Sequence, residues 1–139
     1  MVDVDLRSVL KGPSTEESLS DPVLFSAIVQ RFIDMFDREV YDKIVCTPGS
    51  SAYAGALAHR FGKGITIVRN IDAFSPERGI RTIIIGDDLK DGECIRSIIS
   101  KIEENGGAVI KMGFVTEDTY SDARHKILKG IPLESCCKY

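Results

Sequence analysis

A regular hydrophobic pattern begins shortly after residue 20. Its apolar positions are Leu24, Ile28, Phe32, Met35 and Phe36. This spacing of three and four residues places the side chains on one face of an α-helix. Asp21 and Pro22 suit the start of that helix, because aspartate caps free N–H groups and proline tolerates the first helical position. The pattern predicts an amphipathic helix that runs to about Glu39.

Beyond this helix, short runs of β-branched residues alternate with longer stretches of helical character. The expected strands are Lys43–Cys46, Gly64–Val68, Thr82–Gly86, Ala108–Val115 and Pro132–Cys136. The expected helices between them are Ala52–Phe61, the stretch that follows Gly92, and Ser121–Lys129. Alternating strands and helices are typical of α/β proteins. We therefore expect a doubly wound, Rossmann-like parallel sheet of about five strands, with helices on both faces.

The stretch from Thr82 to Arg96 is the centre of this pattern. A β-branched run leads into Asp87 and Asp88, and a glycine turn then enters an amphipathic helix. The apolar face of that helix is Ile95, Ile98, Ile99 and Ile102. Acidic groups at the carboxyl end of a parallel strand, beside a helix N-terminus, lie where open α/β sheets bind ligands. The sequence thus predicts a binding site at this point.

Composition and charge narrow the functional classes. The chain has 139 residues, 43% hydrophobic and 28% charged, and a net charge of −3, which suits a globular protein of one domain. Lysine and arginine are dispersed, so nucleic acid is not expected as a partner. Neither an apolar stretch of bilayer length nor a signal-like N-terminus is present, so we expect no membrane association and a cytoplasmic location. The four cysteines are expected to be reduced thiols in or near the core.

The central stretch resembles a known signature. An apolar strand, an Asp-Asp pair, a glycine turn and a helix resemble the phosphoribosyl pyrophosphate (PRPP) signature of the type I phosphoribosyltransferases. Asp42–Ser51 followed by Ala56–Ala58 is similar to the first strand, pyrophosphate loop and helix of that family, and Ile65–Arg69 is similar to its second strand. The resemblance runs from Asp21 to the C-terminus and is strongest to adenine- and orotate-type members.

This resemblance implies a fold, an activity and ligands. The fold is a single phosphoribosyltransferase-like domain over residues 1–139, in which residues 1–20 form a small hood-like segment and the strand order is 2-1-3-4-5. The activity is transfer of the 5-phosphoribosyl group from PRPP to a nucleobase, either orotate or a purine, in nucleotide synthesis or salvage. The implied cofactor is Mg²⁺, the partners are PRPP and a nucleobase or nucleotide, and the implied assembly is a homodimer.

The resemblance also assigns roles to residues. Asp87 and Asp88 match the acidic pair that binds the ribose hydroxyls of PRPP and contacts Mg²⁺ indirectly, through substrate or water. The residues that match the pyrophosphate loop and its arginine are Thr47, Gly49, Ser50, Ser51 and Arg69. The residues that match the 5′-phosphate loop are Lys90, Asp91, Gly92, Glu93 and Cys94. Among them, Asp91 matches an aspartate that serves the base in purine-type members and is the expected catalytic residue.

Two departures from the family pattern keep an alternative open. Only Asn70–Ile80 separates the second strand from the central one, too little for the family's mobile loop. The 5′-phosphate loop lacks the family's threonines and carries Glu93, whose carboxylate would repel a phosphate dianion by about 1–4 kcal/mol if it faced the site. The alternative is a non-catalytic module that binds PRPP or a nucleotide, or a degenerate subunit, on the same fold. The orientation of Glu93 distinguishes a usable phosphate site from a lost one.

Overall fold

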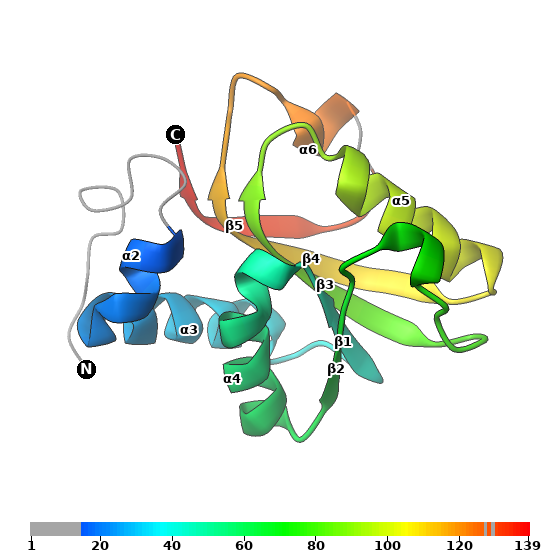
Figure 1. The fold of residues 1–139 in the computed structure, drawn as a ribbon, viewed down its shortest axis with the longest axis horizontal. Coiled ribbons are helices and arrows are strands. Elements are labelled where there is room, and N and C mark those ends of the chain that lie inside the picture. The colour runs from blue at the N-terminus through cyan, green and yellow to red at the C-terminus, as the bar shows by residue number, and fades with distance from the viewer. Residues whose placement is uncertain (1–14, 127, 129) are drawn as a thin grey trace.

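The computed structural model has a single parallel sheet (Figure 1). It describes residues 15–126, 128 and 130–139, in which five strands pair in the order β2-β1-β3-β4-β5, every pair parallel. The strands are β1 (Lys43–Cys46), β2 (Gly64–Ile67), β3 (Arg81–Leu89), β4 (Ala108–Glu117) and β5 (Leu133–Lys138). The helices are α2 (Thr15–Ser20), α3 (Pro22–Phe36), α4 (Ser51–Phe61), α5 (Glu93–Glu104) and α6 (Ala123–Lys126), with 3₁₀ turns η1 (Pro48–Ser50) and η2 (Ile71–Ala73). The expected α/β fold class and strand order are confirmed.

Side chains of the central strand alternate between two hydrophobic cores. Ile83 and Ile85 of β3 pack in the core under α3 and α4, whereas Ile84 packs in the core under α5. Figure 1 shows these helices on opposite sides of the sheet. Because strand side chains alternate with period two and both faces are covered, β3 needs an unbroken apolar run. Each isoleucine buried in this way contributes about 1.5–3 kcal/mol relative to an exposed one.

The two long helices bury the faces that their sequences predict. The buried residues of α3 are Leu24, Ile28, Phe32 and Phe36, and those of α5 are Ile95, Ile98, Ile99 and Ile102. Asp21 caps α3, since its Oδ1 accepts hydrogen bonds from the N–H groups of Val23 at 3.0 Å and Leu24 at 3.2 Å. Gly92 precedes α5 with a φ of 78°, a left-handed conformation that favours glycine.

β3 extends further than the apolar pattern indicates. It continues through Asp87 and Asp88 to Leu89, and Asp88 lies opposite Thr116 of the lengthened strand β4. Aspartate is a poor strand former, but ladder pairing with a neighbouring strand outweighs that preference. The acidic pair is therefore held on a strand, which fixes its side chains more firmly than a turn would.

Other element boundaries also differ from expectation. α3 ends at Phe36 rather than near Glu39, and β5 continues to Lys138 because that residue pairs with Glu117 of β4. The last helix is confined to Ala123–Lys126, with residues 127 and 129 outside the described part.

The N-terminal region contains a helix that the sequence pattern does not predict. Of the expected hood-like segment, residues 1–14 lie outside the described residues, and Thr15–Ser20 forms α2. α2 packs against α3, and the hydroxyls of Ser18 and Tyr53 are hydrogen-bonded. A helix of six residues is too short to be stable alone, so these contacts stabilise it.

Gly86, which precedes the acidic pair, has no room for a side chain. A Cβ there would lie 2.6 Å from two ring carbons of Phe114. We expect Gly86→Ala to lower the free energy of unfolding by about 1–3 kcal/mol, the usual cost of overpacking. Gly55→Ala is the matched control, because a Cβ at Gly55 in α4 meets nothing within 4 Å; it should raise stability by about 0.5–1 kcal/mol. Urea denaturation measures both, and equal effects would contradict the close packing of Phe114 on Gly86.

Candidate functional site

The carboxyl ends of β1 and β3 form the switch point of the sheet. β1 lies between β2 and β3, and the chain leaves β1 for α4 on one face and β3 for α5 on the other. In α/β sheets such a divergence leaves a crevice at the carboxyl edge, where ligands bind. In Figure 1 the arrowheads of β3, β4 and β5 lie together at the upper edge of the sheet. The chain segments that follow these strands therefore gather around one region.

The loop after β1 contacts the first residue of the acidic pair. Thr47 Oγ1 donates a hydrogen bond to Asp87 Oδ1 at 3.1 Å. A Cβ built on Gly49 would lie 2.2 Å from Asp87 Oδ2, so only glycine lets the carboxylate approach the loop this closely. The structure thus brings Thr47, Gly49 and Asp87 together, although 40 residues separate Thr47 from Asp87.

The two serines of this loop stabilise its shape. Ser50 is buried, and its Oγ lies 2.8 Å from the carbonyl oxygen of Ile85 and 3.0 Å from that of Thr47. Ser51 Oγ donates to the carbonyl oxygen of Pro48 at 2.9 Å. Both hydroxyls are therefore used in internal hydrogen bonds, so any contact of this loop with an anion would come mainly from its backbone.

Arg69 lies just beyond the end of β2 and is exposed. Burial raises the pKa of the Cys46 thiol to about 11, and the positive charge of Arg69 opposes that rise. Because β2 pairs with β1 on the side opposite to β3, Arg69 follows the carboxyl end of the strand that lies away from the acidic pair.

The second residue of the acidic pair has two donors from the far strands. Thr116 Oγ1 donates to Asp88 Oδ1 at 2.7 Å, and the Tyr139 hydroxyl lies 3.0 Å from Oδ1 and 2.9 Å from Oδ2. Burial is the main cause that raises the pKa of Tyr139 to about 12, and the hydrogen bond to Asp88 and the negative charge of Asp88 add to it. The hydroxyl therefore remains a donor at neutral pH. Sequence reasoning missed both partners, which are 28 and 51 residues away from Asp88.

A cavity of about 220 Å³ lies between the acidic pair and the start of α5. Its lining includes Thr47, Asp87, Asp88, Lys90, Asp91, Gly92, Cys94 and Phe114. The first N–H groups of a helix have no acceptor within the helix, and the positive end of the helix dipole favours an anion there. Cys94 is exposed, unlike the buried Cys46, Cys136 and Cys137. The expectation of thiols in or near the core therefore fits those three but not Cys94.

Glu93 is exposed and is not among the residues that line this cavity. The neighbouring carboxylate of Asp91 accepts a hydrogen bond from the Glu93 N–H at 3.0 Å, which fixes the turn before α5. Successive helical residues point about 100° apart, so Cys94 can line the cavity while the Glu93 side chain lies in solvent. The Glu93 carboxylate is therefore not one of the charges that line the cavity.

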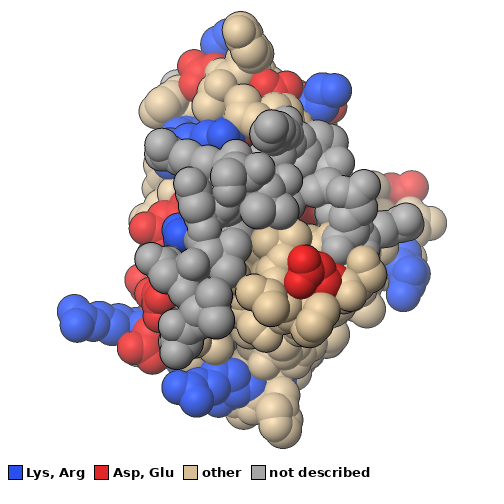
Figure 2. Space-filling model, turned by 90° about the vertical axis from the view of Figure 1, so that its left-hand side faces the viewer, with Lys and Arg blue, Asp and Glu red and all other residues tan. Residues whose placement is uncertain are grey.

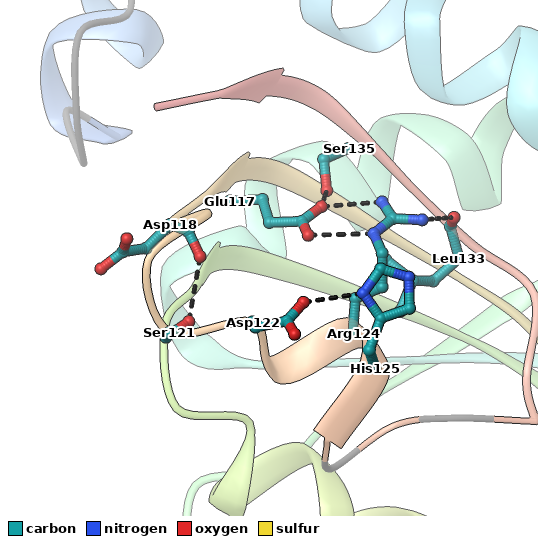
Figure 3. Close-up of polar contacts among 8 residues, drawn as sticks. All are labelled: Glu117, Asp118, Ser121, Asp122, Arg124, His125, Leu133 and Ser135. Atoms are coloured by element: carbon teal, nitrogen blue, oxygen red, sulfur yellow. Dashed lines mark hydrogen bonds and ion pairs between the residues drawn. The ribbon is translucent and has the colours of Figure 1, made fainter.

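A buried ion pair holds the ends of β4 and β5 beside the site (Figure 3). Both carboxylate oxygens of Glu117 accept hydrogen bonds from the guanidinium of Arg124, at 2.8 and 3.0 Å. Ser135 Oγ donates to Glu117 at 2.7 Å, and Arg124 also donates to the carbonyl oxygen of Leu133 at 3.1 Å. Because only 5% of the Glu117 side chain is exposed, these donors decide whether its charge is tolerated.

The surface carries charges of both signs. Figure 2 shows lysine and arginine side chains scattered among acidic ones on one face, without a continuous basic patch among the described residues there. In the part of the chain that the structure describes, no helix has both the length and the apolar character that crossing a bilayer requires.

Comparisons with known proteins agree with this architecture, although no family model matches the chain. An adenine phosphoribosyltransferase of Brevibacillus brevis is 29% identical, over 97% of this chain and 88% of the relative. A xanthine phosphoribosyltransferase of Lactococcus lactis is 23% identical over 99% of this chain, which spans 63% of that protein. The crystal structure of adenine phosphoribosyltransferase from Thermoanaerobacter pseudethanolicus superposes with a TM-score of 0.76 at 24% identity, covering 88% of this chain and 84% of that one.

The sequence similarity extends over nearly the whole chain, and the superposition shows that the fold is shared. In this chain β2 is joined to β3 by residues 68–80, which contain only the turn η2. Over nearly its whole length the chain is therefore similar to adenine phosphoribosyltransferases, and it shares the fold of their solved structures.

Proposed function

We propose that this chain transfers the 5-phosphoribosyl group of PRPP to a nucleobase. The observation that supports this most is the convergence of three features on one cavity: the acidic pair, the loop after β1 and the start of α5. Relatives named for adenine and xanthine favour a purine over orotate as acceptor. We also propose that residues 1–139 act as one phosphoribosyltransferase-like domain.

The proposed roles follow from position and chemistry. Asp87 and Asp88 would accept hydrogen bonds from the ribose hydroxyls of PRPP, since ionised carboxylates are acceptors only. The 5′-phosphate would lie at the start of α5, beside Lys90, and the pyrophosphate beside the backbone of the loop from Thr47 to Ser51, with Arg69 at its outer side. A ring nitrogen of the base attacks C1 of PRPP, the bond from C1 to pyrophosphate breaks, and pyrophosphate leaves. The proton of that nitrogen passes to the carboxylate of Asp91, which lines the cavity and is the proposed catalytic contact to the base.

The acidic pair fits Mg²⁺ that arrives with the substrate. Among the described residues, no group of three or more histidine, cysteine or acidic side chains could hold an ion by itself. Mg²⁺ is commonly bound by one or two carboxylates together with substrate phosphates and water, and two neighbouring aspartates supply such oxygens. Asp87 and Asp88 would therefore hold the ion indirectly. When bound, it neutralises negative charge on the pyrophosphate leaving group.

The first test is calorimetric titration of PRPP, with and without Mg²⁺, into the native chain and Asp88→Asn. We expect Mg²⁺-dependent binding that weakens at least tenfold in Asp88→Asn, because loss of a charge-assisted hydrogen bond costs about 1.5–3 kcal/mol. Asp37→Asn is the matched control, since Asp37 is exposed at the end of α3, before β1 begins. Absence of heat at millimolar PRPP, with native and variant alike, would reject the proposal.

A non-catalytic PRPP-binding module is the second candidate, and the short β2–β3 connection favours it. Residues 68–80 contain no strand and only the turn η2, so they are too few for a lid that excludes water from the reaction. Incubation with PRPP, Mg²⁺ and each of adenine, hypoxanthine, guanine and orotate separates the candidates. Nucleotide and pyrophosphate formed in equal amounts support the enzyme, whereas tight PRPP binding without product supports the module.

Two finer expectations stay predictions. Sedimentation velocity tests the homodimer that the family resemblance implies, and cell fractionation tests the cytoplasmic location. Neither result bears on the assignment of the acidic pair.

A further inference from the structure

We propose that the Tyr139 hydroxyl occupies the side of Asp88 that a ribose diol would use, and that a ligand must displace it to bind. Tyr139 would then be a specificity-determining residue of the site. This inference rests on the proposed function, because it names what competes for the proposed ribose-binding carboxylate.

The Tyr139 hydroxyl lies at nearly equal distances from the two carboxylate oxygens of Asp88. The Tyr139 hydroxyl oxygen is 3.0 Å from Oδ1 and 2.9 Å from Oδ2 of Asp88. Near-equal distances place the hydroxyl between the two oxygens, on the side where paired donors bind a carboxylate. Thr116 approaches Oδ1 alone, at 2.7 Å. Thr116 and Tyr139 both donate to Asp88, but only Tyr139 occupies the side that two neighbouring hydroxyls of a ligand would need.

The backbone around Tyr139 shows that this contact is built into the fold. The Tyr139 N–H donates to the carbonyl oxygen of Glu117 at 2.9 Å, and its own carbonyl oxygen accepts from the Thr119 N–H at 2.9 Å and from Thr119 Oγ1 at 2.8 Å. Glu117 is in turn fixed by the ion pair with Arg124 (Figure 3). The main chain of Tyr139 is thus held, and only rotation of its side chain can clear Asp88.

The exposure of Tyr139 agrees with this role. Tyr139 is only partly buried, which leaves its ring free to turn toward solvent without disrupting a core. A ligand with two neighbouring hydroxyls donates two hydrogen bonds to Asp88 and so replaces the hydrogen bond that Tyr139 gives up. A ligand without a diol offers no such replacement and gains nothing by displacing Tyr139.

The test compares Tyr139→Phe with the native chain in titrations of PRPP with Mg²⁺ and of inorganic pyrophosphate without Mg²⁺, because the ion would link pyrophosphate to Asp88. Phenylalanine keeps the ring but removes the hydroxyl, so PRPP should bind roughly tenfold to a hundredfold more tightly, the equivalent of one hydrogen bond to a charged group. Pyrophosphate carries no ribose, and its affinity should not change. Tyr120→Phe is the matched control, because Tyr120 is 94% exposed in the loop after β4 and loses the same hydroxyl; it should leave both affinities unchanged.

The outcomes distinguish failure of the proposed competition by Tyr139 from failure of the proposed function. PRPP affinity that is equal or weaker in Tyr139→Phe overturns the competition and leaves the proposed function standing. A parallel gain for PRPP and pyrophosphate also overturns it, because the effect would not involve the ribose. If neither protein binds PRPP, the proposed function itself fails, and this inference fails with it.

Discussion

Arg124→Met is expected to lower the free energy of unfolding by about 3–5 kcal/mol, as breaking a buried ion pair from one side usually does. Glu117 has 5% of its side chain exposed and receives two hydrogen bonds from Arg124. Without the guanidinium, Ser135 is the remaining side-chain donor to the Glu117 carboxylate that the structure records. Because 24% of the Arg124 side chain is exposed, water can partly replace it, and we expect the lower end of the range. Urea denaturation at pH 7 measures the loss.

Two further variants separate burial from charge pairing. Arg81→Met removes a similar pair with Asp42, but 50% and 44% of those side chains are exposed, so its loss should stay below about 1 kcal/mol. Combining Arg124→Met with Glu117→Leu removes both buried charges and should recover much of the stability. If Arg124→Met costs no more than Arg81→Met, the buried pair does not hold the ends of β4 and β5.

The same pair predicts the pH dependence. Burial raises the pKa of Glu117, but the hydrogen bonds from Arg124 and Ser135 lower it by more than burial raises it. The net pKa therefore lies below the ordinary value of 4.5. The folded state therefore favours the carboxylate, and its contribution is complete above about pH 4.5 and is lost as the pH falls through the lowered value. In Arg124→Met burial dominates instead, so the stability of the variant should rise on acidification. The difference between the two proteins should narrow toward acidic pH.

Elements whose burial is set by a local pattern could be predicted from the sequence. The apolar face of α5 is read directly from Ile95, Ile98, Ile99 and Ile102, because a helix that packs on a sheet must carry such a stripe. The strand order could not be derived from these patterns alone, and came from the resemblance of the central stretch. The contact between the loop after β1 and Asp87 came from the structure, in which only glycine at position 49 leaves room for the carboxylate.

Contacts between distant residues were beyond sequence reasoning. Tyr139 meets Asp88 across 51 residues, and no motif surrounds it. The ion pair of Glu117 and Arg124 spans only seven residues, but its burial depends on how β5 packs beside β4. The position of Glu93 in the expected phosphate loop suggested repulsion of a phosphate. In the structure the turn formed by Asp91 and Gly92 directs the Glu93 side chain to solvent.

Gly49→Ala is expected to lower kcat/KM for phosphoribosyl transfer by about a hundredfold, the usual result of displacing a reacting group by about 1 Å. The new Cβ would lie 2.2 Å from Asp87 Oδ2, so either the loop or the carboxylate must move. Asp87 is only half-buried, and the variant loses at most its hydrogen bond from Thr47. The free energy of unfolding should therefore fall by no more than about 1 kcal/mol. Steady-state kinetics and urea denaturation of the same preparation measure both quantities.

The comparison with Gly55→Ala makes this result specific to the site. Gly55 lies in α4, where an added Cβ meets nothing within 4 Å, so transfer by that variant should match the native rate. If the chain binds PRPP without turning it over, the clash at Gly49 still displaces Asp87, and the expected loss moves from kcat/KM to PRPP affinity. Native behaviour of Gly49→Ala in both measurements would show that Asp87 does not contact the substrate. Gly49 therefore tests the acidic pair whichever of the two proposed functions holds, because the contact that it protects is common to both.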